Sequence, residues 1–141
     1  LPDNFINFSI FEESKSLAYF HFFKPISGMI SKEFKLDEGH YGVDVVSEED
    51  AGVKSILNGK VVLAAWTAET GHVIAIQHSN ELISIYKHNS VILKKEGDIV
   101  KAGEVIAIVG NSGEFTTGPH LHFEIWFKGS PLNPSEVINF E

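Results

Sequence analysis

From Pro25 onward the chain is a series of short apolar segments separated by turn residues, and this spacing constrains its fold more than any other feature. Residues 72–78 and 121–127 alternate apolar with polar side chains, which is typical of strands with one buried face. Residues 105–109 are continuously apolar, as in a strand covered on both faces. The pattern predicts one mostly antiparallel, all-β domain. The turn signals between the segments are Glu96-Gly97-Asp98, Lys101-Ala102-Gly103 and Asn111-Ser112-Gly113.

Two local patterns make finer predictions. Gly59-Lys60, followed by the apolar residues 61–65, predicts a hairpin turn. At the C-terminus Asn133 is a candidate helix cap, Pro134 suits the first helical position, and Glu136 falls where a capping box needs it. We therefore expect a hairpin at the glycine and a short helix at the C-terminus.

The 141 residues are enough for one domain with its own core. We interpret residues 1–24, which are rich in Phe and Ile, as an N-terminal extension that packs on or leads into the domain, and residues 25–141 as the domain itself. The chain starts at Leu1 with no basic-then-apolar leader, so we expect a piece of a longer or processed protein. Its apolar stretches fall far short of the ~20 residues that a membrane-spanning helix requires.

The composition excludes several classes of function. The net charge is −8 at pH 7 and there is no basic stripe, so we expect no nucleic-acid partner. The chain has no cysteine, which excludes thiolate metal ligands, cysteine nucleophiles and disulfides. An acidic surface favours solubility and says little about the fold.

Seven histidines is a high number for this length, and four of them fall in three short groups. We interpret the other three, His21, His72 and His78, as surface residues or hydrogen-bonded core residues. The three groups are His40-Tyr41-Gly42-Val43-Asp44, Ser84-Ile85-Tyr86-Lys87-His88 and Gly118-Pro119-His120-Leu121-His122-Phe123-Glu124.

The third group places its polar residues on one face of a predicted strand. Alternate residues of a strand share a face, so His120, His122 and Glu124 point the same way. Two imidazoles about 6.6 Å apart along a strand can converge on one centre. Glu124 suits two roles equally, either orienting an imidazole or lying as an exposed strand carboxylate.

The first group requires a bend in the backbone. His40 and Asp44 share a face, but a straight strand would hold them about 13 Å apart. Gly39 and Gly42 permit a bend that brings the two side chains together. A helix would also do so, but these glycines and the valines around them are poor helix formers, and we favour a bent strand or loop.

Zinc suits this inventory of side chains. It takes imidazole nitrogen and carboxylate oxygen in a tetrahedral shell, and a catalytic site leaves the fourth position to water. Two histidines and one aspartate would supply three ligands and leave two histidines for proton transfer. A closed structural site would use four ligands and leave none over.

In these groups the chain resembles the LytM/lysostaphin-type metallopeptidases of family M23, over about Pro25 to Pro134. One departure is Gly71-His72, where many members have Gly-Asn before a strand. The motifs that carry the resemblance are His40 to Asp44, Tyr86-Lys87-His88, Gly97-Asp98 with Val100-Lys101-Ala102-Gly103, Gly110-Asn111-Ser112-Gly113, and Thr117 to Glu124.

The resemblance implies a fold and a set of residue roles. The fold would be a small antiparallel β-sheet or barrel-sandwich domain, of the duplicated hybrid motif type, with an active-site groove. One Zn²⁺ per chain would be bound by His40, Asp44 and His122. His120 would be the general base, and His88 its partner, orienting water or stabilising the oxyanion.

The implied function is a zinc-dependent endopeptidase that hydrolyses peptide cross-links of bacterial peptidoglycan. Its partners would be the peptide stems of the wall, and it would act as a monomer in the cell envelope, outside the cytoplasm and in the periplasm. The composition and hairpin sequence are closest to Gram-negative members, which suggests cleavage of a D-alanyl–diaminopimelate cross-link.

Two other classes of function compete with this interpretation. One is a catalytically silent wall-binding or amidase-activator module on the same scaffold, which a zinc-loaded protein without peptidase activity would favour. The other is a carrier or phosphotransfer domain, because Gly97 to Gly110 resembles the hairpin of biotinyl and lipoyl domains. Such carriers need a modifiable lysine at the hairpin tip, where this chain has Asn111-Ser112-Gly113, and a phosphocarrier has no use for Asp44.

Overall fold

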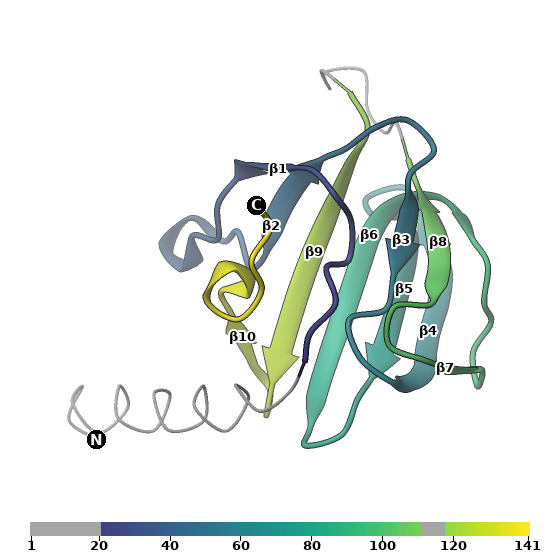
Figure 1. Ribbon diagram of the computed structural model, residues 1–141. Coiled ribbons are helices and arrows are strands. Elements are labelled where there is room, and N and C mark those ends of the chain that lie inside the picture. The colour runs from purple at the N-terminus through teal and green to yellow at the C-terminus, as the bar shows by residue number, and fades with distance from the viewer. Residues whose placement is uncertain (1–20, 111–117) are drawn as a thin grey trace.

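The computed structural model describes residues 21–110 and 118–141, which form ten strands of one antiparallel sheet (Figure 1). The main path runs β1-β2-β9-β6-β5-β4-β7 and ends at β1 and β7 without closing into a barrel. The all-β antiparallel prediction is confirmed. The strands are β1 Met29–Lys32, β2 Val43–Val46, β3 Gly52–Lys54, β4 Gly59–Thr67, β5 Gly71–Gln77, β6 Leu82–Ile92, β7 Ile99–Val100, β8 Val105–Val109, β9 His120–Phe127 and β10 Ser130–Leu132.

The long strand β6 joins two parts of the fold. Its residues 82–87 pair with β9, and its residues 89–92 pair with β8, which in turn pairs with β3. In Figure 1, β3 and β8 lie in front of β4 and β5. The change of partner falls at His88, so this residue lies where the two parts of the sheet separate.

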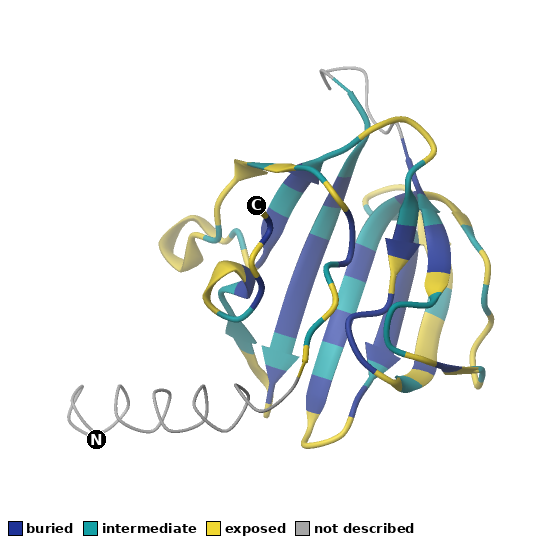
Figure 2. Ribbon diagram, viewed as in Figure 1, coloured by how far each residue is buried: buried dark blue, intermediate teal, exposed yellow. Residues whose placement is uncertain are grey.

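Strand β9 shows how the sequence pattern becomes a two-sided sheet. Leu121, Phe123 and Ile125 are fully buried, while His120 and His122, at alternate positions, are partly exposed (Figure 2). The ring of Phe123 packs 5.2 Å, between centroids, from that of Tyr86 on β6. One face of β9 therefore contributes to the core, and the other is free to carry polar side chains.

The hairpin predicted at Gly59-Lys60 is wrong. Gly59 is the first residue of β4, whose residues 59 and 60 pair with β7. A Cβ atom on Gly59 would lie 2.5 Å from the carbonyl oxygen of Gln77 and 2.8 Å from Nδ1 of His78. Glycine is needed there because two strands approach closely, and not because the chain turns.

The predicted C-terminal helix is reduced to a single 3-10 turn, Pro134–Glu136. The side chain of Asn133 caps it by accepting a hydrogen bond of 3.0 Å from the Ser135 amide. The helix does not continue because Ile138 and Phe140 turn into the core, where they are 5% and 6% exposed.

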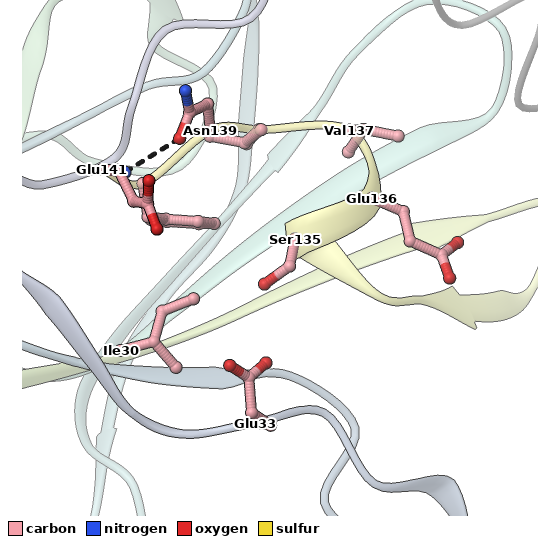
Figure 3. A pocket seen from close by; sticks show the side chains of 9 residues that line it. Ile30, Glu33, Ser135, Glu136, Val137, Asn139 and Glu141 are labelled. Atoms are coloured by element: carbon pink, nitrogen blue, oxygen red, sulfur yellow. Dashed lines mark hydrogen bonds between the residues drawn. The ribbon is translucent and has the colours of Figure 1, made fainter.

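A cavity of about 510 Å³ lies between the end of β1 and this C-terminal segment (Figure 3). Ile30, Glu33 and Ser135 are among the residues that line it, and none of the seven histidines does. The active-site groove implied by the family resemblance therefore stays a prediction.

Several expectations concern parts of the chain that lie outside the description. The predicted turn at Asn111-Ser112-Gly113 and most of the expected extension, residues 1–24, lie outside the described residues. Within the part that is described, no helix has the length and apolar character to cross a membrane.

Candidate metal centre and active site

The pairing of β2 with β9 brings together two residues that are 78 positions apart in the sequence. In this antiparallel register Asp44 lies directly opposite His122, so the two side chains share one face of the sheet. Nδ1 of His122 is 2.7 Å from a carboxylate oxygen of Asp44. The strand register alone therefore assembles two of the three predicted ligands.

His40 reaches the same place through a tight loop before β2. The 3-10 turn Leu36–Glu38 ends at Gly39, whose φ of 71° reverses the chain, and the backbones of Lys35 and His40 then pair with each other. Nε2 of His40 comes to lie 3.4 Å from a carboxylate oxygen of Asp44. The bend expected from the sequence is present at Gly39.

Gly42 has another purpose, because it allows a close approach between strands. A Cβ atom at this position would lie 2.2 Å from the carbonyl oxygen of Phe123 on β9. Any other residue would push the start of β2 away from β9, and with it Asp44 away from His122.

The donor atoms of His40, Asp44 and His122 lie within 4.8 Å of one another, which suits a single metal ion. The hydrogen bonding of the His40 ring gives the clearest evidence for metal binding. Its Nδ1 atom donates a 2.7 Å hydrogen bond to the carbonyl oxygen of Glu33, so the lone pair lies on Nε2. That Nε2 atom is buried and has no hydrogen-bond partner among the described residues. A ring fixed through one nitrogen, with the other free, is the usual arrangement of a metal-binding histidine.

The carboxylate of Glu124 fixes the second histidine ligand. One of its oxygens lies 2.7 Å from Nε2 of His122, and it also accepts hydrogen bonds from Trp126 at 2.8 Å and Lys87 at 3.1 Å. The side chain is only 6% exposed. Of the two roles left open by the sequence, the structure supports the orientation of an imidazole and excludes an exposed carboxylate.

Both carboxylates near His122 have perturbed proton affinities. Burial alone would raise the pKa of Glu124, but the hydrogen bonds from His122 and Trp126 and the nearby Lys87 charge outweigh it and lower the pKa to about 2. Burial would also raise the pKa of Asp44, and its contacts with His122 and His40 reverse this effect and lower it. Both groups are thus held in the ionised form, which is the form that can bind a cation.

His88 and His120 gather beside this cluster without being part of it. Their ring centroids are 5.7 Å apart, and the His88 ring is 6.3 Å from that of His122. Burial lowers the pKa of His88, and the neighbouring His120 and His122 lower it further. The structure therefore brings all five residues of the predicted site to one region of the sheet, and it shifts the His88 imidazole toward the neutral form.

His88 has an unusual backbone for a residue with a side chain. Its φ is 69°, in the left-handed region that few residues other than glycine occupy. Such a conformation costs about 1–3 kcal/mol and persists only where the surrounding structure imposes it. It occurs where β6 leaves β9 for β8, so the irregularity re-aims one side chain at a strand junction.

The remaining histidines agree with their interpretation from the sequence. His78 is a hydrogen-bonded core residue, 5% exposed, whose Nδ1 donates to the carbonyl of Asn58 at 2.7 Å. His21 is exposed, and His72 is partly buried on β5.

The sequence analysis missed two residues that hold Glu124. Trp126 continues the alternation of His120, His122 and Glu124 by one more step on the same face of β9, so extending the pattern would have found it. Lys87 lies opposite His122 in the register of β6 with β9, and only that register reveals its place.

An antiparallel sheet that carries a His/Asp/His cluster with two further histidines beside it has the side chains that a β-sheet metallopeptidase requires. The chain belongs to peptidase family M23, whose family model matches residues 38–134. The predicted family membership is confirmed.

Curated relatives in this family include both hydrolases and activators. The chain is 35% identical over 116 residues to murein hydrolase activator NlpD of Salmonella dublin, covering 81% of this chain and 30% of that protein. It is 35% identical over 98 residues to DD-carboxypeptidase/endopeptidase Mpg of Neisseria meningitidis, covering 70% and 22%. It is 38% identical over 116 residues to outer membrane antigenic lipoprotein B of Haemophilus influenzae, covering 81% and 28%. The chain thus spans less than a third of the length of these relatives.

Solved structures show the same fold. Csd3 of Helicobacter pylori superposes with a TM-score of 0.74 at 34% identity, over 85% of this chain and 33% of that one. A zinc-containing peptidase from Vibrio cholerae superposes with a TM-score of 0.71 at 30% identity, over 81% and 39%.

Proposed function

We propose that this domain is a zinc-dependent endopeptidase that cleaves peptide cross-links of bacterial peptidoglycan. One observation carries the proposal most directly. A buried His40 nitrogen that has no hydrogen-bond partner within residues 21–110 and 118–141 faces the donor atoms of Asp44 and His122, beside two histidines that the metal does not need. A purely structural site would have no use for the extra pair.

The ligands would be Nε2 of His40, the Asp44 carboxylate and Nδ1 of His122. The other nitrogens of the two rings are already engaged by the Glu33 carbonyl and the Glu124 carboxylate. When bound, zinc supplies Lewis-acid polarisation of the scissile carbonyl and acidification of the attacking water.

The chain's own residues would carry the protons. His120 accepts a proton from the attacking water and returns it to the leaving amine, as a general base and then a general acid. His88, whose pKa burial lowers, donates its N–H to the oxygen of the scissile carbonyl as charge develops there. The role of His120 requires an unprotonated imidazole at the start of the reaction, whereas His88 needs only an N–H to donate.

The relatives support the choice of substrate. Mpg is named as a carboxypeptidase and endopeptidase, and NlpD as an activator of murein hydrolases, so both names point to the bacterial wall. The lipoprotein named for the outer membrane supports a place in the cell envelope, and we infer the periplasm.

We also retain residues 25–141 as the peptidase domain and residues 1–24 as an extension, with Ile26 as the first core residue described.

The alternative of a catalytically silent activator rests on the similarity to NlpD. Against it, the chain keeps all five residues of the predicted chemistry, His40, Asp44, His88, His120 and His122. An activator of this kind would bind zinc, release no new amine from walls, and raise the activity of a separate hydrolase.

The deciding experiment incubates the zinc-loaded domain with purified walls of several cross-link chemistries. The expected result is a new amine terminus, identified by mass spectrometry, with D-alanyl–diaminopimelate cross-links as the first candidate substrate. His120→Ala, loaded with the same amount of zinc, is the matched control and should release little. Absence of cleavage on every wall would refute the peptidase and leave the activator.

A further inference from the structure

The backbone of His88 is held from both sides. Its amide donates a 2.8 Å hydrogen bond to the carbonyl of Thr70, and its carbonyl accepts a 3.0 Å hydrogen bond from the Gly110 amide. A Cβ atom on Gly110 would lie 2.3 Å from that His88 carbonyl oxygen, so only glycine can approach so closely. The two anchors come from opposite sides of the strand and fix the peptide units on either side of His88.

The side chain of the next residue, Asn89, bridges the register shift between β5 and β6. Its side chain is 4% exposed, and Nδ2 donates to the carbonyl of His72 at 3.0 Å and to that of Tyr86 at 2.9 Å. Between these two carbonyls the pairing of β5 with β6 shifts register, from His72 opposite Asn89 to Ile74 opposite Tyr86. The amide therefore links the two strands across the break in their ladder.

The chemistry of this contact is specific to an amide. Both hydrogens of Nδ2 are used on carbonyl oxygens, which can only accept. The side-chain oxygen Oδ1 is buried and has no hydrogen-bond partner among the described residues. Aspartate has the same shape but would place a second acceptor against each carbonyl, so shape alone would not preserve the contact.

We propose that Asn89 is a positioning residue, which holds His88 in its left-handed conformation and so aims the His88 ring at His120 and His122. The inference rests on the proposed function only for what the aimed ring does in the reaction. The restraint on the backbone is a separate claim with its own measurement.

The first experiment is a double-mutant cycle on activity. Asn89→Asp should lower kcat by about 10²-fold with little change in KM, because a misplaced catalytic group costs about that much. In a His88→Ala background the same substitution should change kcat by no more than about twofold, since no ring is left to aim. An equal loss in both backgrounds would overturn the proposal, because Asn89 would then act through general stability.

The second experiment does not need activity. Amide hydrogen exchange of His88 and Gly110, measured by NMR on the zinc-loaded protein, reports the two backbone anchors. Asn89→Asp should speed exchange at both amides by about tenfold or more, and should move the His88 Cα shift away from its left-handed value. Unchanged exchange and shift would overturn the proposal, even if activity fell.

Two further variants complete the design. Ser84→Ala removes a buried hydroxyl from the core face of β6, at a position where the pairing with β5 is regular, and should leave exchange at His88 and Gly110 unchanged. Asn89→Ser keeps one donor and should give an intermediate effect, and it replaces Asn89→Asp in both experiments if that variant does not fold. A wild-type protein without peptidase activity would refute the proposed function, and the exchange measurement would still decide the role of Asn89.

Discussion

Both ring nitrogens of His122 face carboxylates, with Nε2 2.7 Å from Glu124 and Nδ1 2.7 Å from Asp44. A neutral imidazole has one N–H and can donate to only one of them. If Glu124 accepts that hydrogen, the Nδ1 lone pair meets an Asp44 oxygen, and a cation must lie between them. A metal ion and a proton therefore compete for the position between Nδ1 of His122 and Asp44. By accepting the hydrogen of Nε2, Glu124 leaves the lone pair of Nδ1 available to the metal ion.

The first prediction follows from this arrangement. Glu124→Ala should lower the affinity for zinc by about 10–100-fold, the usual effect of losing a carboxylate behind a metal-bound imidazole. Glu124→Gln should have a smaller effect, because its amide oxygen can still accept from His122 but not from Trp126 and Lys87 together. Competition with a chromophoric chelator measures the affinity. Glu49→Ala, an exposed carboxylate, is the control, and wild-type affinity in Glu124→Ala would contradict the role.

The second prediction separates ligands from proton carriers. His40→Ala and Asp44→Ala should lose zinc and activity together, because each removes one of three ligands. His120→Ala should keep its zinc while turnover falls by roughly 10²–10⁴-fold, the usual contribution of a general base. Elemental analysis beside a wall-digestion assay tests both. Loss of metal in the His120 variant and retention in His122→Ala would mean that the two roles are reversed.

The part of the site on β9 could be predicted because it depends on local geometry. The period of two in a strand fixes which side chains share a face, so His120, His122 and Glu124 follow from sequence alone. The bend at Gly39 was also foreseeable, since glycine is the residue that reaches a positive φ at low cost. The prediction for Gly59 was wrong, because glycine occurs both in turns and where two strands approach closely, and the sequence alone does not distinguish the two.

The rest depends on contacts between distant segments. Asp44 meets His122 only because β2 pairs with β9 in one particular register, and nothing local specifies that pairing. The left-handed backbone of His88 depends on β6 changing partners from β9 to β8. No single-residue propensity predicts such a conformation for histidine. The side-chain hydrogen bonds of Asn89 form only at this strand junction, so the sequence alone does not reveal its role.

The third prediction tests the conformation of His88 by stability. With φ at 69°, alanine at this position keeps the cost of a left-handed backbone and glycine removes it. His88→Gly should therefore be more stable than His88→Ala by about 1 kcal/mol, the reverse of their order at an ordinary strand position. Urea unfolding of the two variants measures the difference. A more stable alanine variant would show that the left-handed conformation is not kept in solution.

The fourth prediction concerns pH and the buried His78. Burial lowers the pKa of this ring, and the hydrogen bond to the Asn58 carbonyl only partly offsets that effect. The unfolded chain therefore binds a proton near pH 6.5 that the folded chain does not, so stability is full above about 6.5 and falls as the pH decreases toward the lowered folded value. Unfolding free energies measured from pH 7.5 to 5 should fall less steeply in His78→Gln. Parallel curves would assign the loss to other groups.

The last prediction concerns acid and follows from the need for neutral imidazoles. Histidines that bind zinc or accept a proton must be unprotonated, and free histidine titrates near ~6.5. Activity should therefore fall between about pH 7 and pH 5, first because the imidazole that accepts the proton is protonated and then because protons displace the metal. Early in this fall, restoring the pH should restore activity without added zinc, whereas at lower pH recovery should require zinc. A pH-rate profile beside a zinc-release assay on one preparation distinguishes the two stages. Full activity after complete removal of zinc, at any pH, would end the metallopeptidase hypothesis.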